Sequence, residues 1–306
     1  MGARRWRRAW LAVPGAVLAV HDLWRLSAVA RAGLPGATGL PGPAFAMVVP
    51  ARDEARLLPG CLQRLGGAGV TVVDDGSVDG TAVVARAAGA RVVRAGPRPD
   101  GWAGKAWALA RGTEATDQPW LVYVDADVRV GRDALGRLVA AADAAGVPAA
   151  CLLGRQEGFL EFDAALLVAR RGADFRRVND DRSTYLVGQC LAVRRDALAA
   201  AGGWQAVRGS RVEDVDLGVR LGRHRAWSAL GEVAVARRPG RLRTGWRKNM
   251  WRTHGGVVGA AAETGHLVAT AVAPWWAGPG AGTAVYALVA LTRLGARQAG
   301  GRGGWG

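Results

Sequence analysis

The sequence predicts an α/β fold in which a central, mostly parallel sheet is covered by helices on both faces. Between about residues 45 and 235, short apolar runs alternate with longer stretches of helical character, and the connections between them are short. Parallel strands need crossover connections, so this alternation is typical of a parallel sheet with helices on both sides. The chain has 306 residues, of which 50% are apolar, and this suffices for the core of one large domain or two modest ones.

The apolar pattern places the individual strands and helices of this sheet. Buried strands are expected at Phe45–Pro50, Val70–Asp74, Arg91–Arg94, Trp120–Val124 and Ala149–Leu153. Helices are expected between them at residues 54–65, 79–88, 104–115 and 132–145. Ligands of such sheets bind beyond the carboxyl ends of the strands, so functional residues are expected there.

Both ends of the chain are predicted to associate with a membrane. Residues 9–20 form an apolar run behind several arginines; the run is short for a transmembrane helix and also resembles a secretory signal peptide. Residues 267–291 carry no charged side chain and are long enough to cross a bilayer. Pro274 and Pro279 interrupt this stretch, so a re-entrant or interfacial hairpin fits equally well, and the number of crossings stays open.

A Pro- and Gly-rich stretch separates the first apolar segment from the α/β region, and we interpret it as a linker. The expected organisation therefore has four parts. They are a basic and apolar membrane-associated segment (1–34), the linker (35–44), the α/β domain (45–255), and a C-terminal apolar membrane-associated segment with a Gly-rich tail (256–306).

The chain is strongly basic, with 41 Lys and Arg against 25 Asp and Glu and a net charge of +16. The basic residues are spread over the whole sequence, and their two concentrations, residues 4–8 and 237–252, each adjoin an apolar stretch. This distribution favours an anionic membrane surface or a phosphate-bearing ligand over nucleic acid. The cysteines Cys61, Cys151 and Cys190 lie far apart in the sequence, which excludes a disulfide scaffold and a thiolate zinc site.

Acidic residues follow three of the expected strands and should therefore meet at one edge of the sheet. Grouped carboxylates repel one another unless a cation or hydrogen-bond donors lie among them. A pair spaced i, i+2 at a strand end turns both side chains to one face, which suits Mg²⁺ or Mn²⁺ shared with substrate phosphates. The three groups are Asp53-Glu54, the stretch Asp74 to Thr81, and Asp125-Ala126-Asp127.

Each acidic group also has a purely structural interpretation. Asp79 precedes an expected helix and could serve as its N-cap within a turn. The Asp125-Ala126-Asp127 stretch could be a solvated turn, and Glu213 with Asp214 could be ordinary acidic residues in the first turn of a helix. The joint occurrence of the three groups Asp53-Glu54, Asp74 to Thr81 and Asp125-Ala126-Asp127 at strand ends favours a functional site over these separate explanations.

The order of these motifs resembles that of the inverting family 2 glycosyltransferases with a GT-A fold. The resemblance covers roughly residues 45–255, and Gly101 to Lys105 together with the apolar ends is most similar to hopanoid- and carotenoid-associated members. The motifs that carry it are Val48 to Glu54, Val72 to Thr81, Gly104-Lys105, Asp125-Ala126-Asp127, Val187 to Cys190, Gly202-Gly203-Trp204 and Val212 to Leu217.

The resemblance implies a site for a nucleoside diphosphate sugar and a divalent cation. Asp75, with Asp74 beside it, would contact the base and ribose, and Lys105 would lie nearby. Asp125 and Asp127 would form the family's DxD element, with Asp127 the direct ligand of Mn²⁺ or Mg²⁺. The same pocket would be lined by the segment after the first strand, which contains Pro50, Ala51, Arg52 and Glu54.

The resemblance also implies a catalytic base and an acceptor side. Asp214 would be the base and Glu213 its neighbour, while Gly188 and Gln189 would lie on the acceptor side. Trp251 falls where processive relatives carry a QxxRW motif, but Arg247 replaces its Gln and Met250 its Arg. This departure argues against a polysaccharide synthase and leaves an acceptor role for Trp251 as a hypothesis.

These residues suit an inverting, metal-dependent transferase that moves a sugar, with UDP as the expected carrier, to a lipid or other apolar hydroxyl. A cation would stabilise the leaving diphosphate, and one base would remove the acceptor proton. The basic residues 237–252 could steady the diphosphate or form a juxtamembrane belt. The alternative is a non-catalytic nucleotide-sugar-binding or scaffold protein at the membrane. A sugar-phosphate nucleotidyltransferase is disfavoured because Pro50 to Glu54 is acidic instead of Gly-rich and basic.

The location expected is the cell membrane, with the catalytic domain facing the cytoplasm. Arginines at residues 4–8 favour an N-terminus on the inner side. If residues 9–30 then crossed once, the domain would face outward, away from cytosolic nucleotide sugars. Either the N-terminal segment is a helix that lies in the membrane interface, which we favour, or the charge rule for topology fails here.

Overall fold

The structure, a computed structural model, describes residues 42–156, 186–210, 212–222, 224–229 and 232–236, together with positions 17 and 34–36. Apart from Val17, these residues belong to one compact unit that draws on residues 32–161 and 175–237. The predicted membrane-associated segments 1–34 and 256–306 lie almost wholly outside the described residues. No helix within the described ranges is long and apolar enough to cross a membrane.

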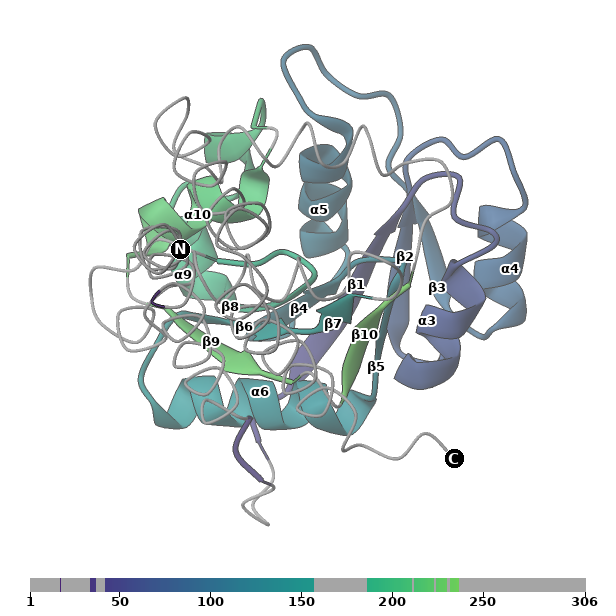
Figure 1. The fold of residues 1–306 in the computed structure, drawn as a ribbon. Helices are drawn as coiled ribbons and strands as arrows, with labels where there is room; N and C mark the ends of the chain where they lie inside the picture. Colours follow the sequence, from purple (N-terminus) through teal and green to yellow (C-terminus); the bar gives the residue numbers. More distant parts are fainter. Residues whose placement is uncertain are drawn as a thin grey trace, which may run out of the picture. The chain divides into compact units, whose positions relative to one another are not determined.

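The described residues form a seven-stranded sheet with the strand order β3-β2-β1-β4-β8-β6-β9 (Figure 1). The pairs β1–β2, β2–β3, β1–β4 and β6–β9 are parallel, whereas β8 runs antiparallel to both β4 and β6. The expected mostly parallel sheet is therefore confirmed. Its strands are β1 (Phe45–Ala51), β2 (Val70–Asp74), β3 (Arg91–Arg94), β4 (Trp120–Val124), β6 (Ala149–Leu153), β8 (Cys190–Arg194) and β9 (Arg225–Ser228).

Helices cover both faces of this sheet, as predicted. On β1, Val49 packs in the same buried cluster as α3 and α6, whereas Val48 faces Gly112 of α5. Because successive strand residues point to opposite faces, α5 lies across the sheet from α3 and α6 (Figure 1). The helices are α3 (Leu58–Leu65), α4 (Thr81–Ala87), α5 (Gly104–Glu114), α6 (Arg132–Ala144), α9 (Arg195–Ala200), the 3₁₀ helix η2 (Trp204–Val207) and α10 (Glu213–Leu221).

A second, three-stranded sheet has the order β5-β10-β7 and adjoins the DxD segment. Its strands are β5 (Val128–Val130), β10 (Val233–Val235) and β7 (Arg155–Gln156). β5 begins directly after Asp127, and the backbone N–H of Ala236 donates to the Asp127 carbonyl at 2.8 Å. The turn at residues 125–127 is therefore held at both sides by strands.

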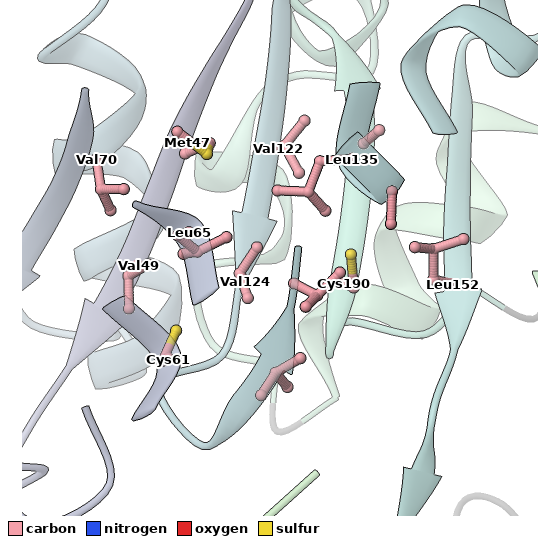
Figure 2. Packing of buried hydrophobic residues seen from close by; sticks show 14 of the residues in the cluster. Met47, Val49, Cys61, Leu65, Val70, Val122, Val124, Leu135, Leu152 and Cys190 are labelled. Atoms are coloured by element: carbon pink, nitrogen blue, oxygen red, sulfur yellow. The ribbon is translucent and has the colours of Figure 1, made fainter. Parts of the chain in front are cut away.

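The main hydrophobic core fills the space between the sheet and the α3/α6 face (Figure 2). Alternate strand residues point into it, and the amphipathic helices supply leucines from their buried sides. Each fully buried aliphatic side chain contributes about 1.5–3 kcal/mol. Figure 2 labels ten members of this core, namely Met47, Val49, Cys61, Leu65, Val70, Val122, Val124, Leu135, Leu152 and Cys190.

Most predicted elements are confirmed, with small differences at their ends. Four expected strands have the observed bounds, and the first is one residue longer, ending at Ala51. The first helix begins at Leu58 instead of 54, because the Glu54 carbonyl accepts the N–H groups of Leu57 and Leu58 in a preceding turn. The next helix begins at Thr81 with Gly80 as its N-cap, so the alternative of Asp79 as N-cap is wrong.

Candidate active site

The register of the sheet brings the carboxyl ends of β1, β2 and β4 to one edge. Ala51, the last residue of β1, lies opposite Asp74, the last residue of β2. β4 is also parallel to β1, so Asp125 follows its end at the same edge. β8 is antiparallel to β4 and begins opposite Val124, which places its amino end, after Gln189, at this edge too.

The neighbouring residues Asp74 and Asp75 have different environments. The Asp74 carboxylate accepts the Ser77 N–H at 2.9 Å and so shapes the turn that follows β2. Asp75 instead approaches the start of α5, and Arg52 Nη1 lies 3.5 Å from its Oδ2. Burial raises the pKa of the Asp75 carboxyl, and the nearby guanidinium groups of Arg52 and Arg98 offset only part of this effect. Asp74 therefore has a structural role in the turn, whereas the Asp75 carboxylate lies between Arg52 and the start of α5.

A network of backbone-to-side-chain bonds ties the segment after β1 to the segment after β2. The Asp53 N–H donates to Ser77 Oγ at 3.0 Å, and Asp53 Oδ1 accepts the Val78 N–H at 2.9 Å. Asp53 has φ of 53°, a left-handed conformation that these two bonds hold in place. The Glu54 N–H likewise donates to Thr81 Oγ1 at 2.8 Å.

Asp79 completes this network, as an acceptor in the turn that precedes α4 and not as the N-cap of that helix. Its Oδ1 accepts the Thr81 N–H at 2.9 Å, and its Oδ2 accepts the Ala55 N–H at 3.1 Å. The Thr81 hydroxyl also donates to Oδ1 and is the main cause of a lowered pKa of the Asp79 carboxyl, and the backbone N–H donors lower that pKa further. In the stretch 74–81, Asp74 and Asp79 therefore form the turn, and the Asp75 carboxylate faces Arg52 and the start of α5.

Lys105, on the first turn of α5, joins two acidic segments that are distant in the sequence. Its Nζ lies 2.7 Å from Asp125 Oδ1 and 3.2 Å from Glu213 Oε1. Burial alone would lower the pKa of the Lys105 ammonium, but the carboxylates of Asp125, Glu213 and Asp214 together outweigh burial and raise it. Lys105 is therefore charged and supplies positive charge where these carboxylates converge.

Asp125 and Asp127 have the composition of a site for a hard divalent cation. Burial raises the pKa of the Asp125 carboxyl, the Lys105 ammonium lowers it, and the Asp127 carboxylate raises it. No set of three or more His, Cys, Asp or Glu residues within the described ranges is arranged to hold a metal ion by itself. Two carboxylates are enough for a Mg²⁺ or Mn²⁺ site in which substrate phosphates and water supply the remaining ligands of the ion.

Asp214 lies on the first turn of α10, beside the loop that precedes β8. The Gly188 N–H donates to Asp214 Oδ2 at 2.7 Å, and the Val215 N–H donates to Oδ1 at 2.9 Å. Burial has the largest effect on the Asp214 carboxyl and raises its pKa. The Lys105 ammonium and the two N–H donors lower this pKa, whereas the Glu213 carboxylate raises it. A carboxylate with a raised pKa at a fixed orientation is suited to accept a proton.

The two acceptor-side residues that the structure describes adjoin both acidic groups. Gly188 contacts Asp214, and the Gln189 carbonyl accepts the Asp125 N–H at 3.0 Å. The segment 188–189 therefore lies between the predicted base and the DxD element. Trp251, and with it the whole basic stretch 237–252, falls outside the described residues.

The three cysteines are free and buried. Burial raises the pKa of Cys61 and of Cys151 to about 12, and it also raises that of Cys190. Cys61 Sγ, which lies in the main core, donates to the Asp125 carbonyl at 3.8 Å. Cys61 and Cys190 pack in the main core as small apolar residues (Figure 2).

Two contacts of the site were not predicted, although Gly104 and Trp204 belong to the motifs named above. A β-carbon at Gly104 would lie 2.6 Å from Asp75 Oδ2 and 3.3 Å from Arg98 Nη1, so α5 begins against the Asp75 carboxylate. On the same side of the sheet, Trp204 Nε1 lies 3.1 Å from the Tyr123 hydroxyl and 3.2 Å from Thr113 Oγ1. This buried network connects η2 to β4 and α5, and α10 in turn packs against η2.

Comparison with known proteins bears on this arrangement. Residues 41–246 match the sequence model of the family described as "Glycosyltransferase like family 2". The 4,4'-diaponeurosporenoate glycosyltransferase of Staphylococcus aureus (strain MRSA252) is 37% identical over 102 residues, which cover 31% of this chain and 27% of that protein. The enzyme of the same name from Staphylococcus haemolyticus (strain JCSC1435) is 34% identical over 95 residues, covering 29% and 25%. The aligned region thus spans only about a quarter of these curated relatives.

Solved structures share the fold over most of the chain. A mannosyltransferase from Pyrobaculum calidifontis, in complex with GDP-Man and Mn²⁺, has a TM-score of 0.53 and 19% identity, covering 95% of this chain and 92% of that one. Glucosyl-3-phosphoglycerate synthase from Mycobacterium tuberculosis, in complex with Mn²⁺, UDP-glucose and phosphoglyceric acid, has a TM-score of 0.51 and 22% identity, covering 73% and 80%. These similarities show a shared α/β architecture.

Proposed function

The chain belongs to the glycosyltransferase-like family 2, and from this premise we propose that it transfers a sugar from a nucleoside diphosphate sugar to an acceptor hydroxyl with inversion at the anomeric carbon. One observation carries the proposal. Lys105 joins Asp125 of the DxD element to Glu213, the neighbour of Asp214, at the edge where Asp75 also lies. Donor binding, cation binding and proton removal would thus occur at one place.

The donor would bind along the ends of β1 and β2. Asp75, which faces Arg52, Arg98 and the start of α5, would meet the nucleoside, and the backbone of residues 50–54 would line the pocket. We propose UDP as the carrier, since the synthase with the shared fold holds UDP-glucose. The mannosyltransferase with the shared fold holds GDP-Man, so a GDP-linked donor is the competitor to test.

Asp127 and Asp125 would hold Mn²⁺ or Mg²⁺; the synthase and the mannosyltransferase with the shared fold both hold Mn²⁺. When bound, the cation supplies Lewis-acid stabilisation of the charge on the leaving diphosphate, an effect of several kcal/mol. Lys105 adds a fixed positive charge beside Asp125, which orients that carboxylate and offsets repulsion from Glu213.

Asp214 would act as the general base. Its carboxylate would accept the proton of the acceptor hydroxyl while the acceptor oxygen attacks the anomeric carbon from the side opposite the diphosphate, so the configuration inverts. A positioned base contributes roughly 10²–10⁴-fold in rate. The first-turn position on α10 favours the ionised form, which is the form that accepts the proton.

We propose a lipid or other apolar acceptor at the cell membrane, with the catalytic domain facing the cytoplasm. The partial relatives are named for glycosyl transfer to 4,4'-diaponeurosporenoate, and residues 267–291 of this chain carry no charge. A cytoplasmic orientation would give the site access to nucleotide sugars. Protease protection of tagged termini in sealed vesicles tests this orientation, and protection of the domain in inside-out vesicles would refute it.

A transfer assay on the full chain with UDP- and GDP-sugars, an apolar polyene or polyprenol acceptor and Mn²⁺ tests the proposed function. We expect transfer by the wild type and a loss of about 10²–10⁴-fold in kcat for Asp214→Asn. Asp216→Asn is the matched control: Asp216 lies on the same helix and its Oδ2 accepts the Ser210 hydroxyl, which an amide oxygen can also do. Donor binding without turnover would favour the non-catalytic alternative and refute the proposal.

A further inference from the structure

We infer that Gly188 is a positioning residue for the catalytic base, because its lack of a side chain and its N–H together fix the orientation of the Asp214 carboxylate. The inference rests on the proposed function, since it concerns a residue that acts through Asp214. It adds a residue outside the acidic motifs to the machinery of proton removal.

The contact between the two residues is unusually close. The Gly188 N–H donates to Asp214 Oδ2 at 2.7 Å. A β-carbon at position 188 would lie 2.9 Å from Oδ2, 3.0 Å from Cβ and 3.2 Å from Cγ of Asp214. All three nearest neighbours of that β-carbon, among the described residues, thus belong to the base. Any side chain at position 188 would have to displace the carboxylate.

The backbone conformation gives no other reason for glycine at this position. Positive φ angles occur at several glycines of the described ranges, such as Gly76 and Gly101, but Gly188 is outside that set. Another L-residue could therefore adopt the local conformation. What position 188 requires is space for Asp214, which separates this glycine from those needed for turns.

The same segment connects the base to the cation-binding residues. Gly188 donates to Asp214, and the carbonyl of the next residue, Gln189, accepts the Asp125 N–H at 3.0 Å. Oδ1 of Asp214 is held separately by the Val215 N–H at 2.9 Å. Two consecutive residues of main chain therefore set where the base lies relative to the DxD element, and a shift of about 1 Å in such a constellation can cost about 10²-fold in rate.

A kinetic double-mutant cycle tests this role, with Gly188→Ala and Asp214→Asn made singly and together. We expect Gly188→Ala to lower kcat about 10- to 100-fold while the KM for the donor changes less than about twofold. In the Asp214→Asn background the same substitution should change kcat by less than about twofold, because the group through which Gly188 acts is already lost. An equal loss in both backgrounds would show a merely structural role and overturn the inference.

Gly136→Ala is the matched control for a glycine-to-alanine change. Gly136 lies inside α6, its φ is not positive, and a β-carbon there would meet nothing within 4 Å. This variant should keep the wild-type kcat and melt at the wild-type temperature or slightly above it. A comparable loss of kcat in Gly136→Ala would remove the case for a specific effect at position 188.

Thermal unfolding gives a readout that does not depend on activity. Gly188→Ala should lower the Tm, and the decrease should be smaller when Asp214→Ala removes Oδ2 and Cγ from the contact. Equal decreases in both backgrounds would overturn the inference even if Gly188→Ala folds too poorly for kinetics. A wild-type chain that transfers no sugar would refute the proposed function itself, whereas an active wild type with an additive cycle refutes only the role of Gly188.

Discussion

Lys105 Nζ lies 2.7 Å from Asp125 Oδ1, and through this ion pair the start of α5 is fastened to the end of β4. The same ammonium lies 3.2 Å from Glu213 Oε1, so one cation holds three elements at the site. Asp125, Glu213 and Asp214 would otherwise repel one another at short range. The charge of Lys105 therefore controls both the geometry of the site and the protonation of its carboxylates.

Replacing Lys105 by Met should move the acid limb of the kcat–pH profile to higher pH. The base must be ionised, and burial already raises the Asp214 pKa above its usual value of 3.8, so the rate falls as the pH drops through this raised pKa. Lys105 lowers that pKa, and its removal raises it further. The profile is measured at saturating donor and Mn²⁺. Lys105→Arg keeps the charge and should keep the wild-type limb; identical limbs for the two variants would contradict the prediction.

Asp127→Asn should abolish the metal-dependent part of the activity and lower kcat/KM by about 10²–10³-fold. The reason is that a cation held by Asp127 would stabilise the charge on the leaving diphosphate by several kcal/mol. Thermal shift with UDP, with and without Mn²⁺, provides a second measurement. The wild type should gain stability only when both are present, and Asp127→Asn should not. Asp143→Asn, an exposed carboxylate on α6, is the control and should behave as the wild type. A metal-dependent shift retained in Asp127→Asn would place the cation elsewhere.

Gly104→Ala should raise the KM for the donor about tenfold with a smaller effect on kcat. The added β-carbon would lie 2.6 Å from Asp75 Oδ2, so the carboxylate that we propose to meet the nucleoside must move. A tenfold change corresponds to about 1.4 kcal/mol of donor binding. Initial rates at varied donor concentration measure this effect. Alanine at Gly136 serves as the comparison here too, and an unchanged donor KM in Gly104→Ala would show that Asp75 does not contact the donor.

Trp204→Phe should lower the free energy of unfolding by about 0.5–1.5 kcal/mol, because the buried Tyr123 hydroxyl and Thr113 Oγ1 lose the indole N–H as a donor but stay hydrogen-bonded to each other at 2.6 Å. Tyr123→Phe should cost less, since Trp204 Nε1 keeps Thr113 Oγ1 as acceptor. Thermal and urea unfolding of the two variants measure the difference. A smaller cost for the Trp204 variant than for the Tyr123 variant would show that the indole N–H does not organise this network.

The sheet, and the carboxylates at the carboxyl ends of its strands, could be predicted because both follow from the local pattern of apolar and polar residues. Buried parallel strands consist of short apolar runs with turn residues at their ends, and Val70–Asp74 and Trp120–Val124 have this form. β8 was not predicted, although it completes the site. Its residues Cys190 to Val193 are buried on both faces, and a short apolar run without alternation does not distinguish a strand from a buried helix.

The contacts within the site were beyond the reach of sequence reasoning. Lys105 and Glu213 meet only because α5 and α10 begin at the same edge of the sheet, and that placement depends on the antiparallel strand β8 and on the Trp204 network. The resemblance to a family supplied the candidate residues, but not which oxygen of Asp214 is held or why residue 188 has no side chain. Such details depend on distances of a few tenths of an ångström.

β3 forms one border of the seven-stranded sheet, and its first and last residues, Arg91 and Arg94, are exposed. A border strand offers unpaired backbone groups that can recruit the same strand of another molecule and start aggregation. Two long cationic side chains at the ends of this four-residue strand repel an approaching copy and shorten the stretch that could pair. A chain with so much apolar sequence is thereby protected, along this border, against assembling into sheets with itself at high concentration.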